Sequence, residues 1–207
     1  KTGGKSAALV MNANPFTLGH QYLVETAAAA CDTLHLFVVS EDASLVPFAV
    51  RKRLVAEGVA HLPNVILHDS GPYIISNATF PSYFLKDEAA VISGHARLDL
   101  AVFTKIAKAL NITARYVGEE PTSQVTGLYN QIMAEQLPRA GIDCIIVPRK
   151  EVNGKAISAS TVRQCLQAEE WATLETLLPQ TSLDYFRSPE ARIIVDRIRK
   201  AENVVHY

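Results

Sequence analysis

The sequence predicts an α/β fold, a Rossmann-like doubly wound parallel sheet of about five strands with a helical extension at its C-terminal end. Two observations predict it. Short apolar runs of strand length alternate with stretches of helical periodicity as far as residue 147. Such alternation is typical of a parallel sheet with helices on both faces. From residue 160 onward, only helical spacing continues.

The first half of the chain is expected to hold three strands and two helices. Apolar runs of strand length occupy residues 7–11, 34–39 and 65–67, and helical spacing occupies residues 20–31 and 48–62. Pro63 and Asn64 should end the second helix. Residues 71–81 are rich in Gly, Pro, Ser, Asn and aromatic side chains, which predicts a long surface loop.

The second half should add two strands and several helices. Helical spacing is strongest at 98–110, a strand follows at 112–117, and a helix at 126–137 should end near Pro138. The last strand is expected at 142–147, closed by Pro148. The remainder, 160–205, has helical spacing interrupted at Pro179 and Pro189. We expect a single domain over 1–207, with about 164–207 as its helical C-terminal part.

Composition excludes several classes of protein. The hydrophobic fraction is 48%, the charged fraction 20% and the formal net charge −1, so nothing indicates a general binder of nucleic acid or membranes. No apolar run reaches the ~18 residues that a membrane span needs. Three scattered cysteines argue against a disulfide framework and favour a reducing cytoplasm. The absence of an initial Met indicates a piece of a longer protein.

A first candidate site is the segment 12–20, which reads Asn-Ala-Asn-Pro-Phe-Thr-Leu-Gly-His and connects a buried strand to a helix. Gly19 allows close approach of the backbone to a ligand. The N–H groups and dipole of the first helical turn favour an anion. His20 and Thr17 could both reach that anion. The alternative is a helix cap followed by a solvent-facing histidine.

A second candidate site is the segment 155–163, which follows the last strand and opens another helix. Ser158 or Ser160 could be an N-cap, but a cap explains one hydroxyl, and Thr161 adds a third. Arg163 places a positive charge where the helix dipole opposes it. A bound phosphate would resolve that conflict, because Arg is suited to bridging phosphate oxygens.

Weaker candidates lie elsewhere on the ligand edge. Lys86 could meet the α-phosphate or a small acid, and Arg51 begins the helix after the second strand; ordinary surface positions are the alternative for both. Gly118 and Glu119 follow the fourth strand and could approach adenine or ribose. Asn130, on the next helix, is a further candidate for the adenine.

These motifs resemble a known superfamily. Thr17-Leu18-Gly19-His20 resembles the HxGH signature of the HUP-type nucleotidyltransferases, which include cytidylyltransferases, and the segment 157–163 resembles their second signature, ISxSxxR. The departure is Thr17, where most of the superfamily has a His. The resemblance implies that the role of this first imidazole in holding the phosphates is weakened or passed to a hydroxyl.

A narrower resemblance covers most of the chain, from about residue 7 to about residue 205. The segments 11–20, 71–81 and 118–121 are similar to the catalytic domain of the citrate lyase ligase family. Members usually carry an acetyltransferase-like domain before this one. The resemblance implies catalytic roles for His20, Thr17 and Lys86. It implies ATP binding by a larger set: Asn12, Asn14, Phe16, Gly19, His20, Gly118, Glu119, Ile157, Ser158, Ser160, Thr161 and Arg163.

The resemblance also implies a reaction. Acetate and ATP should give acetyl adenylate and pyrophosphate, and the acetyl group should then pass to a dephospho-CoA-derived thiol on the acyl-carrier subunit of citrate lyase. Such in-line attack needs positioning and charge stabilisation more than covalent help. Mg²⁺ would be held by phosphates and water, with no direct protein ligand.

Three other readings stay open. The first is an adenylyl- or cytidylyltransferase for a phosphorylated small molecule, which would need cations in the loop after the third strand; residues 71–85 contain no Arg or Lys. The second is an acetate ligase that modifies tRNA, which the near-neutral charge disfavours. The third is a nucleotide sensor without catalysis.

Overall fold

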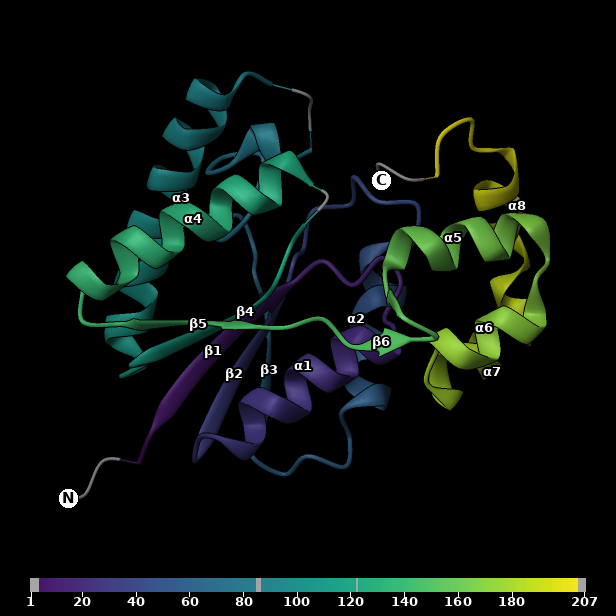
Figure 1. Cartoon of the computed structure of the whole chain (residues 1–207), viewed down its shortest axis with the longest axis horizontal. Helices are drawn as coiled ribbons and strands as arrows, with labels where there is room; N and C mark the ends of the chain where they lie inside the picture. Colours follow the sequence, from purple (N-terminus) through teal and green to yellow (C-terminus); the bar gives the residue numbers. More distant parts are fainter. Residues whose placement is uncertain (1–3, 85–86, 122, 205–207) are drawn as a thin grey trace. The chain divides into compact units, whose positions relative to one another are not determined.

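Five parallel strands form the main sheet in the order β3-β2-β1-β4-β5 (Figure 1). The computed structural model describes residues 4–84, 87–121 and 123–204. The strands are β1 Ser6–Met11, β2 Thr33–Val38, β3 Val65–Asp69, β4 Ala114–Gly118 and β5 Asp143–Val147. Strand order reverses between β1 and β4, which is the switch point of a doubly wound sheet. The predicted fold class is confirmed.

The helices alternate with these strands and then continue alone. They are α1 Leu18–Ala29, α2 Phe48–Gly58, α3 Ala89–Ala109, α4 Gln124–Arg139, α5 Ala159–Ala168, α6 Trp171–Leu177, α7 Gln180–Arg187 and α8 Arg192–Lys200, with 3-10 turns at Pro81–Tyr83 and Pro189–Ala191. Within the described ranges, no helix combines the length and the apolarity that crossing a membrane requires.

One helix boundary was predicted wrongly, because α2 ends at Gly58, short of residue 62. Helix α3 covers most of the region of strongest apolar spacing and extends back to Ala89. Helix α4 ends at Arg139, near Pro138 as predicted, with the proline inside its last turn. A proline lacks only its own N–H donor, and near a helix end that loss is small.

The chain folds into two compact units that interleave in sequence. The first comprises residues 1–11, 26–41 and 64–148, and the second comprises residues 12–25, 42–63 and 149–207. The first unit carries the main sheet with α3 and α4. The second carries α2 and α5–α8, and α1 begins in the second unit and ends in the first. A single domain over 1–207 stays a prediction.

In the first unit, α3 and α4 pack against each other on one face of the sheet (Figure 1). Ala8, Phe37 and Val117 from the strands share a buried cluster with Phe103 of α3 and Met133 of α4. The register pairs Leu9 with Tyr116, so β1 and β4 end at the same edge. Ligands of such sheets bind at the carboxyl edge, and the loop that begins with Asn12 leaves β1 there.

The segment 71–80 is a loop, as predicted, but half of its residues are buried, which a surface loop does not explain. Ile74 and Phe80 have no exposed surface. Asp99 of α3, also fully buried, accepts the Ile75 N–H at 2.6 Å and the Thr79 hydroxyl at 2.8 Å. The Tyr129 hydroxyl donates to its other oxygen. Sequence pattern could not show this, because the anchoring carboxylate lies about 20 residues farther along the chain.

Candidate phosphate-binding site

Two buried arginines hold the loop that precedes α1. Arg51 of α2 donates through Nη1 to the Asn12 carbonyl at 2.8 Å and through Nε to the Val46 carbonyl at 2.9 Å. Arg163 of α5 donates through Nη1 to the Asn14 carbonyl at 2.5 Å. Arg51 is 0% exposed, so a solvated position for it is wrong. Both guanidinium groups therefore fix the backbone of the first motif by bonding its carbonyls.

Side chains of the loop add to this bracing. The Asn14 side-chain oxygen accepts the Val46 N–H at 3.0 Å, and Asn12 Nδ2 donates to Ser44 Oγ at 3.0 Å. Phe16 has no exposed surface, and a Cβ at Gly58 would lie 2.3 Å from its ring. We therefore interpret Asn14 and Phe16 as residues that shape the loop, which is preorganised before any ligand arrives.

His20 lies in the first turn of α1, and its ring nitrogen Nδ1 contacts Thr17. The Thr17 backbone N–H donates to His20 Nδ1 at 3.1 Å, and Thr17 Oγ1 lies 2.9 Å from the same nitrogen. Burial, and after it the charge of Arg149, lower the pKa of His20 from 6.5 to about 4. The imidazole is therefore neutral near pH 7, and since Nδ1 accepts, its hydrogen lies on Nε2.

The second motif caps α5. Ser158 is the N-cap, and its Oγ accepts the Thr161 N–H at 3.1 Å. The hydroxyls of Ser160 and Thr161 lie 2.9 and 2.8 Å from Ser158 Oγ. The three hydroxyls predicted to gather at one helix N-terminus are thus linked to one another.

Arg163 is buried and bonds backbone carbonyls. Besides Asn14, its guanidinium donates through Nε to the Val204 carbonyl at 2.5 Å. Burial lowers the pKa of Arg163 to about 10, which leaves it cationic at neutral pH. Contact of Arg163 with a phosphate stays a prediction.

The two motifs meet within the second unit. A Cβ at Gly19 would lie 3.4 Å from both Cβ and the carbonyl oxygen of Ile157. Together with the bond from Arg163 to Asn14, this contact joins the start of α1 to the start of α5. Sequence spacing alone could not show that segments about 140 residues apart share one site.

A short hairpin beside this junction was missed. Strands β6 Glu151–Val152 and β7 Lys155–Ala156 pair antiparallel. Their turn, Asn153-Gly154, has φ of 53° and 72°. Asn-Gly is the strongest short-range hairpin signal, so the sequence did carry the information.

Two cations directly precede the hairpin and lie near the first turns of α1. The Lys150 carbonyl accepts the Ile157 N–H at 2.9 Å, and Lys150 Nζ lies 5.9 Å from the centroid of the Tyr22 ring. Arg149, the preceding residue, is the charge that acts on His20. Neither Arg149 nor Lys150 was among the predicted site residues, because no motif marks them.

The remaining candidates lie apart from the two motifs in sequence and belong to the first unit. Asn130 Nδ2 donates to the Gly118 carbonyl at 2.9 Å, and the Glu119 N–H donates to the Val147 carbonyl at 2.9 Å. These bonds order the carboxyl ends of β4 and β5. Contact of Gly118, Glu119 or Asn130 with adenine stays a prediction, and Lys86 lies outside the described residues.

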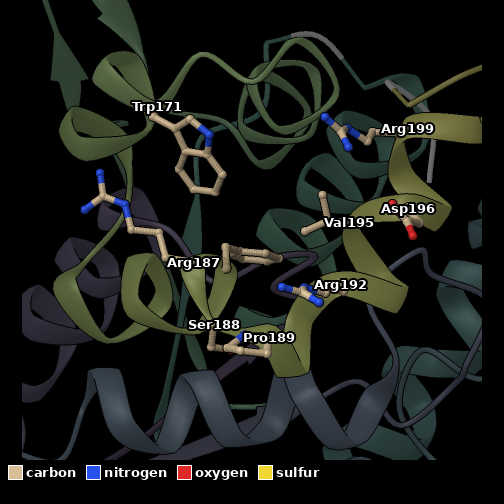
Figure 2. A pocket seen from close by; sticks show the side chains of 9 residues that line it. Trp171, Arg187, Ser188, Pro189, Arg192, Val195, Asp196 and Arg199 are labelled. Carbon is tan, nitrogen blue, oxygen red and sulfur yellow. The ribbon is translucent and has the colours of Figure 1, made fainter.

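A cavity of about 250 Å³ opens between α6, α7 and α8 (Figure 2). Trp171, Arg187, Arg192 and Arg199 are among the residues that line it, and neither motif contributes to it. Arg187 pairs with Glu175 at 2.5 Å, and Arg199 pairs with Glu169. Because these carboxylates offset two of the three arginines, the cavity attracts anions less than its residues alone indicate.

Comparison with known proteins decides the family. The model of the citrate lyase ligase C-terminal domain matches residues 6–186. The chain belongs to this family. Citrate (pro-3S)-lyase ligase of Haemophilus influenzae is 44% identical over 89% of the chain and 57% of its own length. The corresponding ligase of Klebsiella pneumoniae is 45% identical over 88% of the chain and 55% of its own length. The chain thus spans about half the length of these relatives of the ligase family.

Solved structures show the same fold at low identity. A Vibrio parahaemolyticus protein described as a nicotinate-nucleotide adenylyltransferase superposes with a TM-score of 0.56 and 15% identity, over 96% of this chain and 98% of that one. TmcAL of Thermotoga maritima, bound with alpha-thio ATP, superposes with a TM-score of 0.53 and 12% identity. This superposition covers 87% of this chain and 54% of TmcAL. Both place the ligase-family chain among nucleotidyltransferase-like folds.

Proposed function

We propose that this chain is the catalytic part of an ATP-dependent citrate lyase ligase that activates acetate and acetylates a carrier thiol. Family membership over residues 6–186 supports the reaction. The observation that carries the site is the junction of the two motifs, where Arg163 of the second holds the Asn14 carbonyl of the first at 2.5 Å. The relatives' own names supply ligation of citrate lyase as the activity to test, and acetate as the ligated acid is part of the proposal.

The chemistry has two balanced steps. An acetate oxygen attacks the α-phosphorus of ATP, the bond to the β-phosphate oxygen breaks, and acetyl adenylate and pyrophosphate form. The thiol of the acyl-carrier subunit then attacks the acetyl carbon, AMP leaves with the electron pair, and the thiol proton passes to solvent. The dephospho-CoA-derived nature of that thiol group and a cytoplasmic location are parts of the proposal.

His20 contributes as a neutral donor. Its Nε2–H is proposed to bond an α- or β-phosphate oxygen as negative charge moves onto pyrophosphate. A preorganised donor of this kind typically lowers the barrier by about 3 kcal/mol. With a pKa of about 4, His20 is a hydrogen-bond donor in the resting protein and not a general acid.

The N-termini of the two helices and nearby cations would supply the remaining contacts to the triphosphate. The N-terminus of α1, the Ser160 and Thr161 hydroxyls, and the side chains of Arg149 and Lys150 are proposed to hold the triphosphate. Arg51 and Arg163 would act indirectly, by keeping the backbone of the loop before α1 in its conformation. Among the described residues, no three His, Cys, Asp or Glu side chains gather to hold a metal. In this proposal, Mg²⁺ is held by phosphate oxygens and water, and no step is assigned to it.

Pyrophosphate release from ATP tests this proposal. Acetate should support it, whereas pantetheine phosphate and nicotinamide mononucleotide should not. Turnover without acetate, or with a phosphorylated acceptor alone, would overturn the proposal in favour of an adenylyltransferase. His20→Ala should lower acetate-dependent turnover by about 100-fold. His61→Ala is the matched control, since His61 is exposed and pairs with Glu25 at 2.9 Å.

A further inference from the structure

We infer that Thr17 is a positioning residue, which holds His20 as the Nε2–H tautomer through a reciprocal pair of hydrogen bonds at the start of α1. The sequence assigned Thr17 a share in holding the phosphates. The geometry points to a different role, in which Thr17 acts on the ligand through His20. The kinetic part of this inference rests on the proposed function, and the spectroscopic part does not.

Thr17 occupies the N-cap position of α1. It directly precedes Leu18, and its carbonyl accepts the Gln21 N–H at 3.0 Å, the first bond of the helix. Thr17 Oγ1 accepts the His20 N–H at 3.3 Å. A Thr that caps the third helical residue in this way satisfies one of the unpaired donors of the first turn.

The second hydrogen bond of the pair runs from the Thr17 backbone to the His20 side chain. In an ordinary capping box, a Glu or Gln at the third helical position accepts the N-cap backbone N–H. Here His20 Nδ1 accepts the Thr17 N–H at 3.1 Å. Thr17 Oγ1 lies 2.9 Å from the same nitrogen. The imidazole therefore replaces the usual carboxylate or amide.

This pairing sets the protonation of His20. A backbone N–H can only donate, so a hydrogen on Nδ1 would place two donors against each other. Phe16 stacks on the imidazole at 5.8 Å between ring centroids, which limits rotation of the ring. The only hydrogen left on the neutral ring is on Nε2, on the side of the ring opposite Thr17.

Burial separates this role from direct phosphate binding. Thr17 is 1% exposed, whereas His20 is partly exposed. The hydroxyl of Thr17 is thus enclosed, whereas His20 is only half-buried as a residue. A Thr in place of the first His of the HxGH signature accordingly has its own physical reason, since it caps the helix and orients the second His.

Nitrogen-detected NMR of His20 in the whole chain tests the inference. In the wild-type protein at neutral pH, the hydrogen should be on Nε2. Thr17→Asp keeps a good N-cap but presents a carboxylate near Nδ1, so the pKa of His20 should rise by about one to three units. A hydrogen on Nδ1 in the wild-type protein, or an unchanged pKa of His20 in the variant, would overturn the inference.

Kinetics supply the second readout. Thr17→Val should lower kcat for acetate-dependent pyrophosphate release about tenfold with little change in the KM for ATP, since a misplaced donor loses contacts made in the transition state. Thr17→Ser should recover most of kcat. Equal kcat values for the Val and Ser variants would rule out the positioning role. If the wild-type protein releases no pyrophosphate, the proposed function fails while the NMR result still decides the tautomer.

Discussion

Two loops of this protein are held by buried charges of opposite sign. The segment 12–17 precedes α1, and the guanidinium groups of Arg51 and Arg163 donate to its carbonyls. The segment 71–80 follows β3, and the carboxylate of Asp99 accepts its Ile75 N–H and Thr79 hydroxyl. Each charge satisfies backbone groups that would otherwise be costly to bury.

The sign of the bracing charge decides what each loop can bind. Cations that engage carbonyls leave a positive field around the first loop, which favours phosphate. Around the second loop, the Tyr129 hydroxyl that bonds Asp99 also accepts from the buried Arg115 at 3.4 Å, so the two charges offset each other and leave no excess positive charge for a phosphate. The first loop is therefore suited to a triphosphate, and the second is suited to a structural role or a neutral ligand.

The largest expected effect is on the carboxylate-braced loop. Asp99→Asn keeps one oxygen that can accept from Ile75 and Thr79, but it turns N–H donors toward the hydroxyl of Tyr129 and removes the buried charge. The free energy of unfolding should fall by about 3 kcal/mol. Chemical denaturation measures it. A change under about 1 kcal/mol would show that Asp99 does not anchor the loop.

Arg163→Met should affect the guanidinium-braced loop in two ways. Loss of the donor to the Asn14 carbonyl should cost about 2 kcal/mol of unfolding free energy. The KM for ATP should also rise about tenfold, because the loop is no longer held for phosphate. Denaturation and pyrophosphate release measure these effects. The contrast with Asp99→Asn fails if both variants change the KM for ATP equally.

A smaller effect is expected from pH. His20 has a folded pKa of about 4 and an unfolded value near 6.5, so the unfolded chain takes up the proton first. The neutral imidazole therefore contributes to the free energy of unfolding above pH 6.5, and this contribution is lost as the pH falls toward 4. The free energy of unfolding should fall by no more than about 1 kcal/mol per pH unit. His20→Gln should remove this slope. Denaturation between pH 4 and 7 compares the two proteins, and identical slopes would contradict the lowered pKa.

The smallest effect should come from a charge outside both loops. Arg53 and Glu190 form an ion pair at 2.9 Å, with side chains 47% and 60% exposed. Glu190→Ala should change the free energy of unfolding by less than about 1 kcal/mol. This variant serves as the reference for the buried braces. A loss as large as that of Arg163→Met would show that burial is not what distinguishes them.

The motifs were predictable because their residues are local. The helix starts after 17 and 158 follow from capping chemistry, and Thr17, His20, Ser158 and Arg163 stand at fixed offsets from them. Arg149 was not predictable in the same way, since its action on His20 joins residues that are far apart in sequence and no local pattern marks it.

The sequence by itself determined the parallel sheet, the order of its elements and the two signatures, because apolar periodicity and capping are properties of neighbouring residues. Only the tertiary structure decided that Arg51 and Arg163 are buried and donate to backbone carbonyls, and that Asp99 holds the segment 71–80. The physical reason is that a charge acts over a few ångströms of space, and folding places groups about 20 to 150 residues apart within that reach.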